Sequence, residues 1–165
     1  LYSGAAAITL GVFVRAPELG WPYIEALRRN DALAVRGNGA VLTAVASGEK
    51  AYGILVDFMA LNAKAKGSPV EFVFPREGVT IVTEPVAILK TTRNEAAARA
   101  FVDFLLSEEG QKLAAAQGYY PAHRNVDPPP GFPKIDTLRI LPMDAAGMLS
   151  TTEPEKKRFA ELFGQ

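Results

Sequence analysis

Apolar residues recur at helical spacing in several stretches of the chain, and residues that favour helix ends border these stretches. Ser3, Asn94 and Ser107 each precede such a stretch at the position of a helix cap. The first stretch carries an apolar stripe of Ala7, Ile8, Leu10 and Val14. The pattern predicts helices over residues 4–15, 22–29, 40–46, 58–66, 95–106 and 108–117, and a last helix that begins at residues 153–154.

Short apolar runs between these helices predict strands. The run Val-Ala-Ile-Leu at residues 86–89 is apolar throughout, which is typical of a strand buried on both faces. The predicted strands cover residues 33–36, 51–56, 70–74, 79–82, 86–89 and 138–141. Because strands and helices alternate, the sequence predicts an α/β protein, with a shift in composition at residues 75–79 as the candidate boundary between lobes.

The composition of the chain argues against several classes of function. Lys and Arg together number 18, as do Asp and Glu, and this balance argues against nucleic acid as a partner, since phosphate binding requires a basic excess. The chain has no cysteine, which excludes disulfides and thiolate metal sites. Residues 1–4, Leu-Tyr-Ser-Gly, do not resemble a signal peptide, so we expect any signal segment to lie outside this chain.

Several segments, taken in order, resemble the bacterial extracellular solute-binding proteins of ABC importers, in the branch that includes ferric-iron binders. The most specific segment is residues 86–111, in which an apolar run is followed by two capped helices and the sequence Ser-Glu-Glu-Gly-Gln. Weaker similarities are carried by residues 48–56, 66–78, 118–124, 140–144 and 158–163.

This resemblance implies a type 2 periplasmic-binding-protein-like fold, an α/β architecture of two lobes with the ligand held in the cleft between them. Residues 1–75 would form part of the second, ligand-closing lobe. Residues 76–165 would return to the first lobe and supply the C-terminal helices. The resemblance also implies that much of the N-terminal lobe is absent from this chain.

Two glycine-containing turns are candidate ligand sites. Ser3, Gly4 and Ala5 begin a helix, where backbone N–H groups and the helix dipole favour an anion. Asn38 and Gly39 lie in a Gly-Asn-Gly turn where a ligand could approach the backbone closely. For both turns, simple helix capping is the competing interpretation.

Asp57 and Phe58 are the third candidate, since they directly follow a predicted strand and ligands gather at the carboxyl ends of strands. By the resemblance, Asp57 and Phe58 correspond to a position at which ferric-iron binders of the family carry adjacent tyrosines. Phe58 cannot ligate a metal, so we expect no metal site here, and Asp57 could instead pair with an ammonium group or cap a helix. We interpret Tyr119 and Tyr120 as packing residues and the lone His123 as a surface residue.

The resulting hypothesis is a periplasmic or extracellular receptor, with a lipoprotein anchor as one form, that captures a small anionic solute and delivers it to an ABC permease. Ferric iron as cargo is the alternative, and the effector-binding domain of a transcription regulator is an alternative of another class. No nucleophile with a base and no pair of convergent acids indicates an enzyme, and we expect no cofactor. The receptor is expected to be monomeric, with self-association of the isolated chain.

Overall fold

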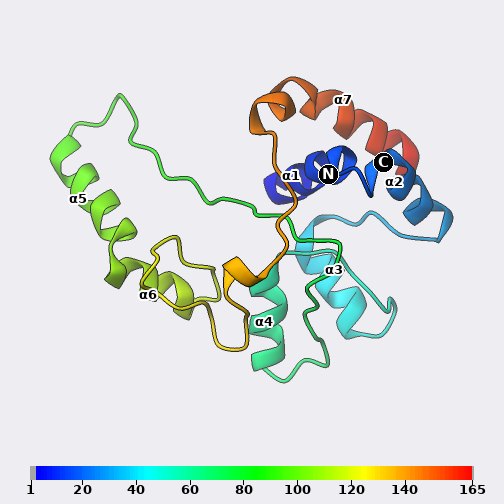
Figure 1. Cartoon of the computed structure of the whole chain (residues 1–165), viewed down its shortest axis with the longest axis horizontal. Helices are drawn as coiled ribbons and strands as arrows, with labels where there is room; N and C mark the ends of the chain where they lie inside the picture. The colour runs from blue at the N-terminus through cyan, green and yellow to red at the C-terminus, as the bar shows by residue number, and fades with distance from the viewer. Residues whose placement is uncertain (1–2, 165) are drawn as a thin grey trace. The chain divides into compact units, whose positions relative to one another are not determined.

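The computed structural model describes residues 3–164, and Leu1, Tyr2 and Gln165 lie outside the described residues. The helices are α1 Gly4–Arg15, α2 Gly20–Arg29, α3 Gly37–Ala46, α4 Asp57–Ala65, α5 Glu95–Leu106, α6 Glu108–Ala116 and α7 Ala145–Phe163, with a 3₁₀ helix η1 at Ile135–Thr137 (Figure 1). The chain forms two compact units. Unit 1 contains the described residues up to Val82 and those from Arg139 onward, and unit 2 is Thr83–Leu138.

The core of unit 1 lies where α1 packs against α2 and α7. Its buried cluster consists of Val12, Ala16, Leu141 and Met148. Gly11 allows a close approach of α7, because a Cβ atom at this position would lie only 2.5 Å from Cε of Met148. The first and last helices of the chain therefore form one small core.

The helices α3 and α4 form a second helix pair within unit 1. After α3 the chain reverses, and the amide of Lys50 donates to the carbonyl of Ala44 at 3.0 Å. Gly53 then lies directly against α3, since a Cβ atom there would be 2.5 Å from Cγ1 of Val41. The chain thus runs back along α3 before α4 begins.

In unit 2, α5 packs against α6 through a tight junction at Ser107. Ser107 is both the C-cap of α5 and the N-cap of α6, and its Oγ accepts a hydrogen bond from the amide of Gly110 at 3.1 Å. Gln111 fixes the junction further by donating to the carbonyl of Leu105 at 2.7 Å and accepting from the amide of Ala122 at 2.6 Å. The predicted caps Asn94 and Ser107 are both confirmed.

The predicted strands do not form ladders within the described residues. An isolated parallel bridge joins Val79 and Ile140, with the amide of Val79 donating to the carbonyl of Arg139 at 2.9 Å. The run at residues 86–89 was predicted to be a buried strand, but Val86 and Leu89 are 46% and 73% exposed. A strand forms only when a neighbouring backbone is present to share its hydrogen bonds. An apolar run favours an extended conformation but does not provide that neighbouring backbone. The described residues therefore do not form the sheet that the predicted periplasmic-binding-protein α/β lobe requires.

Four helix starts also differ from the predictions. The helices α2, α3 and α4 begin earlier than predicted, at Gly20, Gly37 and Asp57, so that Val56 and not Asp57 is the N-cap of α4. The last helix begins at Ala145, capped by Asp144, whose Oδ1 accepts from the amide of Gly147 at 2.9 Å. Pro154 was predicted to open this helix but lies inside it. Proline removes one backbone donor, yet the long α7, which packs on α1 and α2, continues through that position.

The division into lobes at residue 75 remains a prediction, because the two compact units follow contacts within this chain alone. Among the described residues, none of the helices combines the length and apolarity that a membrane crossing requires.

Candidate functional site

The starts of α2, α3 and α4 lack a side-chain cap, unlike those of the other α-helices. The helices α1, α5, α6 and α7 begin with a Ser, Asn or Asp side chain that accepts a backbone hydrogen bond. The caps of α3 and α4 are Arg36 and Val56, and neither side chain makes such a bond. The first backbone amides of a helix have no partner within it, so an uncapped start is suited to an external acceptor.

The start of α3 is also sterically open. Gly37 has a φ of 83°, in the left-handed region that favours glycine, and it turns the chain into the helix. A Cβ atom at Gly37 or Gly39 would meet no atom within 4 Å. Asn38 lies between them as a half-buried residue in the first turn. A ligand could therefore approach the backbone here, with the amide of Asn38 as an adaptable donor or acceptor.

Asp57 is the first residue of α4, and its carboxylate Oδ1 accepts a hydrogen bond from the amide of Phe58 at 2.8 Å. Burial raises the pKa of the Asp57 carboxyl above its usual value, although hydrogen bonds from the backbone amides of Phe58 and of Asp57 itself act in the opposite direction. The ionised form is thus poorly solvated. A partly buried carboxylate at a helix start can bind a solute, and it can equally stabilise the helix by accepting hydrogen bonds from its first amides.

Ser3 acts as a helix cap. Its Oγ accepts a hydrogen bond from the amide of Ala6 at 3.2 Å, and Gly4 and Ala5 form the first turn of α1. This geometry is that of ordinary capping, and a role for Ser3, Gly4 and Ala5 in ligand binding remains a prediction.

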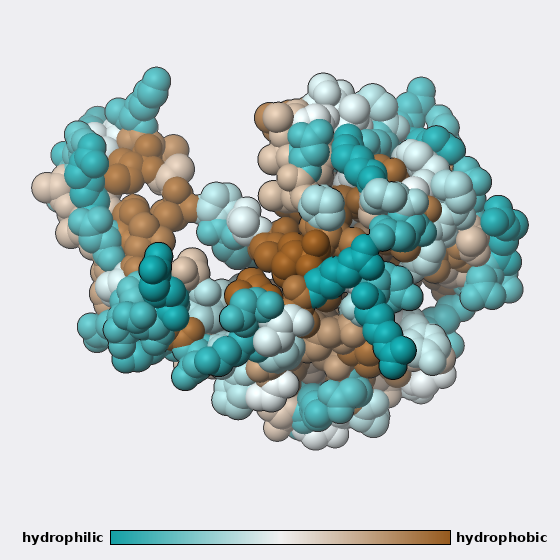
Figure 2. Space-filling model, in the orientation of Figure 1, coloured by the Kyte–Doolittle hydropathy of each residue, from teal (hydrophilic) through white to brown (hydrophobic). Residues whose placement is uncertain are grey.

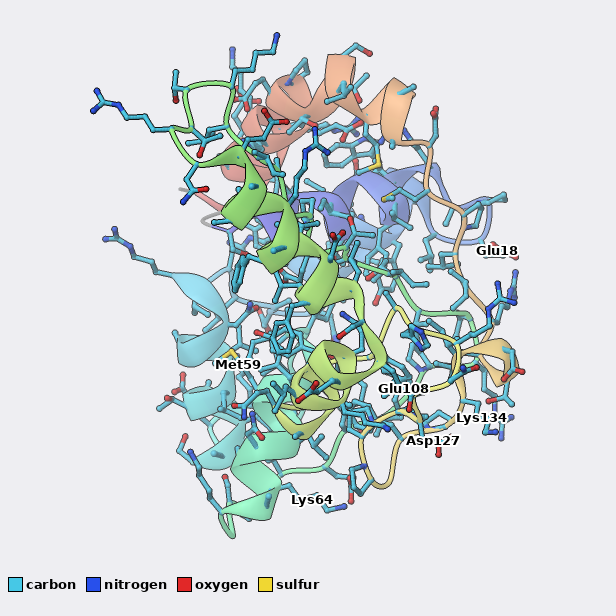
Figure 3. All side chains as sticks on the ribbon, turned by 90° about the vertical axis from the view of Figure 1, so that its left-hand side faces the viewer. Glu18, Met59, Lys64, Glu108, Asp127 and Lys134 are labelled. Atoms are coloured by element: carbon cyan, nitrogen blue, oxygen red, sulfur yellow. The ribbon has the colours of Figure 1, made fainter. Side chains whose placement is uncertain are left out.

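Two of the three candidate positions lie on helices that pack against each other. Asn38 and Gly39 lie on α3, and Asp57 and Phe58 lie on α4. Figure 3 marks the course of α4 from Met59 near its start to Lys64 near its end. The start of α1 is apart from this pair, because α1 packs on α2 and α7 and not on α3 or α4.

Metal-ligating side chains do not cluster within residues 3–164: no three His, Asp or Glu residues are placed to hold an ion there. Tyr120 packs as predicted, with its ring stacked on Phe132 at a centroid distance of 5.4 Å and its hydroxyl donating to the carbonyl of Pro133 at 3.0 Å. His123 accepts a hydrogen bond from the amide of Asn125 at 3.3 Å within the loop after α6.

Two features were missed at the level of sequence. Arg15 ends an otherwise apolar helix and forms an ion pair with Glu155 across 2.9 Å, and the only signal was a charge at the end of an apolar stripe. Unit 2 contains a groove of about 410 Å³ between the run at residues 86–89 and α5. The exposure of that run could not be inferred from its apolar composition.

Comparison with known proteins identifies the family of this chain. Residues 18–146 match the family of bacterial extracellular solute-binding proteins. The chain belongs to this family, whose membership implies a periplasmic-binding-protein fold.

Three relatives illustrate how far the similarity extends. The major ferric iron-binding protein of Neisseria gonorrhoeae is 29% identical over 144 residues, which cover 78% of this chain and 39% of that protein. The protein of the same name from Neisseria meningitidis is 30% identical over 145 residues, covering 78% of this chain and 40% of the relative. An uncharacterized protein of Haemophilus influenzae is 49% identical over 55 residues, 33% of this chain and 16% of that protein.

This chain therefore spans about two fifths of the length of the two ferric iron-binding proteins that it matches. None of the solved structures matches it.

Proposed function

We propose that this chain forms part of the substrate-binding component of a bacterial ABC importer, which captures a small anionic solute and delivers it to a membrane permease. The observation that carries the proposal is the family match over residues 18–146. Matches to an extracellular family favour a transport receptor over the effector-binding domain of a transcription regulator. They also favour a periplasmic or extracellular location and a binding role without catalysis.

The proposed ligand site is formed by the starts of α3 and α4, two helices that pack against each other. Asn38 and Gly39 would present backbone amides and one side-chain amide to an anionic group of the solute. Asp57 would contact an ammonium or hydroxyl group of the same solute, and Phe58 would supply an apolar wall. The start of α3 supports this assignment, because its N-cap side chain makes no capping bond and an external acceptor would satisfy its first amides. At α4 the carboxylate of Asp57 already accepts from the amide of Phe58, so the support there is the carboxylate itself. Ser3, Gly4 and Ala5 would form a second anion-binding start.

Capture would follow from closure of two lobes around the solute. A ligand that contacts both lobes only in the closed form shifts the population toward that form, and the permease would dock on it. In this scheme the residues of α3 and α4 contribute one side of the cleft. The remaining contacts would come from polypeptide of the kind that the longer relatives possess beyond the matched region.

Ferric iron is the second candidate solute, favoured by the similarity to two proteins named for iron binding. Fe³⁺ is a hard cation that prefers several oxygen ligands, and Asp57 offers one carboxylate beside a phenyl ring. An iron site on this chain would thus need additional donors from outside it. The anionic solute suits the local chemistry better.

Native mass spectrometry of the purified chain, followed by titration with inorganic phosphate, citrate and Fe³⁺, tests the proposal. We expect binding of an anion that Asn38→Ala weakens about tenfold, the effect of losing a hydrogen bond to a charged group. Asp103→Ala, which removes an exposed carboxylate from α5 in unit 2, is the matched control for Asp57→Ala. Unchanged affinity for a retained solute in Asp57→Ala would refute the role of Asp57. An iron-sized mass increment would favour the second candidate.

A further inference from the structure

Asn38 is the one asparagine of the chain that a glycine follows. In such a pair the backbone nitrogen of the glycine can attack the side-chain carbonyl of the asparagine and close a cyclic imide. Glycine favours this attack, because it has no side chain to obstruct the nitrogen and its backbone is the most flexible. The other asparagines, at positions 30, 62, 94 and 125, precede Asp, Ala, Glu and Val. The sequence thus makes Asn38 the most reactive asparagine.

The two reacting groups have no hydrogen-bond partner within the described residues. The side-chain amide of Asn38 contacts no donor or acceptor there. Gly39 is the third residue of α3, and the amides of a first turn have no acceptor inside their own helix. The N-cap Arg36 makes no side-chain bond to these amides. Gly39 contributes its carbonyl, which accepts from Oγ1 of Thr43 at 3.0 Å, and its nitrogen is left available for the attack.

The attack requires the first turn of α3 to open, because in a helical backbone the next nitrogen points away from the asparagine side chain. Little holds this turn closed. A Cβ atom at Gly37 or Gly39 would meet no atom within 4 Å, so neither glycine is fixed by packing. The helix has no buried residue, and helix ends with few contacts open at low free energy. Gly39 is exposed, on a surface over α3 and α4 that carries polar as well as apolar side chains (Figure 2), so water reaches the site.

We propose that Asn38 and Gly39 form a spontaneous deamidation site, at which the neutral start of α3 becomes anionic with time. A bond forms between the nitrogen of Gly39 and Cγ of Asn38. The side-chain nitrogen of Asn38 leaves as ammonia and takes the proton that Gly39 loses. Water then opens the imide at one of its two carbonyls. One opening gives aspartate, and the other gives isoaspartate, in which the main chain passes through Cβ.

The charge that deamidation introduces would weaken the binding of an anionic solute, a consequence that rests on the proposed function. The amide of Asn38 can donate to an anion, whereas a carboxylate only accepts hydrogen bonds and repels negative charge. A negative charge in the first turn of a helix interacts favourably with the helix dipole. The aspartate product therefore keeps α3 folded, and its loss of anion binding is electrostatic.

Peptide mapping by mass spectrometry of the 165-residue chain, sampled during incubation at mildly alkaline pH, measures the modification. We expect Asn38 to gain the mass difference between an amide and a carboxylate severalfold faster than the other asparagines. Asn62, inside α4, and Asn94, whose Oδ1 accepts from the amide of Ala97 at 3.1 Å, are controls within the same sample. Gly39→Ala should remove most of the difference, because its methyl group obstructs the nitrogen while fitting the open space around it. If Asn38 reacts no faster than Asn62, the proposal is overturned.

An introduced helix cap tests whether the uncapped first turn allows the reaction. Arg36 has φ −79° and ψ 94°, the extended conformation of an N-cap residue. In Arg36→Ser the hydroxyl can accept from the amide of Gly39 and hold its nitrogen in the helix. We expect this variant to slow deamidation about fivefold, the change in population that a capping bond produces. Arg36→Ala removes the same charge without adding an acceptor and should not slow the reaction, so equal rates in the two variants would contradict the role of the uncapped turn.

Titration with inorganic phosphate separates this proposal from the proposed function. We expect Asn38→Asp to bind phosphate about tenfold or more weakly than the parent chain, with its helices retained by circular dichroism. Asn125→Asp, the same change at an exposed position of unit 2, should bind as the parent does. Equal phosphate affinity in the parent and Asn38→Asp would refute the consequence for binding. Rapid reaction of Asn38 in a chain that binds no phosphate would contradict the anion site and support the deamidation site.

Discussion

Nη2 of Arg15, at the end of α1, lies 2.9 Å from Oε1 of Glu155 on α7, and only 24% and 13% of the two side chains are exposed. The same guanidinium donates to the carbonyl of Gly11 at 2.7 Å and to the hydroxyl of Thr151. Because these residues are far apart in the sequence, the contact links the two ends of the chain within unit 1. A partly buried ion pair of this kind costs more to break than an exposed one, since its remaining charge loses both partner and water.

We predict that Glu155→Ala lowers the free energy of unfolding by about 1–3 kcal/mol, the cost of leaving a partly buried charge without its partner. Glu153→Ala is the matched control on the same helix. Glu153 pairs with Lys156 at 2.8 Å but is 81% exposed, so its removal should change stability by less than about 0.5 kcal/mol. Urea unfolding followed by circular dichroism measures both. Equal effects would show that the Arg15 pair contributes no more than a surface pair.

Two glycines at helix contacts should respond differently to alanine. At Gly110 a Cβ atom would lie 2.1 Å from the carbonyl oxygen of Phe104, which is backbone and cannot move without opening the junction of α5 and α6. At Gly11 the nearest atom is the terminal methyl of Met148, which can adopt another rotamer. We expect Gly110→Ala to destabilise unit 2 by more than about 2 kcal/mol and Gly11→Ala to cost about 1 kcal/mol. Thermal unfolding of both variants tests the ranking, and a reversed order would contradict it.

Asp57 should make stability depend on pH in a defined direction. Burial raises the pKa of its carboxyl in the folded chain, so the folded state keeps this proton at pH values where the unfolded chain has lost it. The contribution of Asp57 is therefore fully present below the unfolded pKa, about 4, and is lost as pH rises through the folded value.

We predict that Asp57→Asn gains stability relative to the parent chain as pH rises from about 4 toward neutrality. The asparagine Oδ1 can still accept the amide hydrogen bond of Phe58, so the change isolates the charge. Urea unfolding at a series of pH values measures the difference, with Asp103→Asn on exposed α5 as control. A constant difference between variant and parent across this range would be incompatible with the raised pKa.

Tyr120 anchors the loop that follows α6. Tyr120→Phe removes only the hydrogen bond to the carbonyl of Pro133 and should cost about 1 kcal/mol. Tyr120→Ala also removes the stack on Phe132 and should cost about 3 kcal/mol. Tyr52→Phe is the control, because Tyr52 is 91% exposed and should be neutral. Chemical denaturation provides the free energies, and a neutral Tyr120→Ala would mean that the loop is not held by this ring.

The predicted helix caps illustrate what local sequence decides. Asn94 and Ser107 bond to amides three residues later, so both partners of each contact lie within one turn. The bounds of α5 follow directly, from Glu95 to Leu106 as predicted. The start of α7 was predicted too far along the chain, because tertiary packing and not the local signal of a proline decides it. Pro154 is a local signal for a helix start, but the packing of α7 on α1 carries the helix through it.

Part of the candidate site could also be anticipated. The Gly-Asn-Gly turn and the carboxylate at Asp57 were visible in the sequence, because helix starts and the residues that open them are local features. The sequence did not show that these residues lie on two helices that pack against each other. That packing depends on the reversal of the chain before Gly53, a tertiary feature.

The sequence by itself determined the helices with strong end signals, the absence of thiol chemistry and the resemblance that membership of the family confirms. Only the tertiary structure decided that residues 86–89 are exposed rather than buried, that Arg15 meets Glu155, and that α3 and α4 begin without side-chain caps. The physical reason is that helices close their hydrogen bonds within a few residues, whereas a strand or a buried ion pair requires a partner from a distant part of a polypeptide.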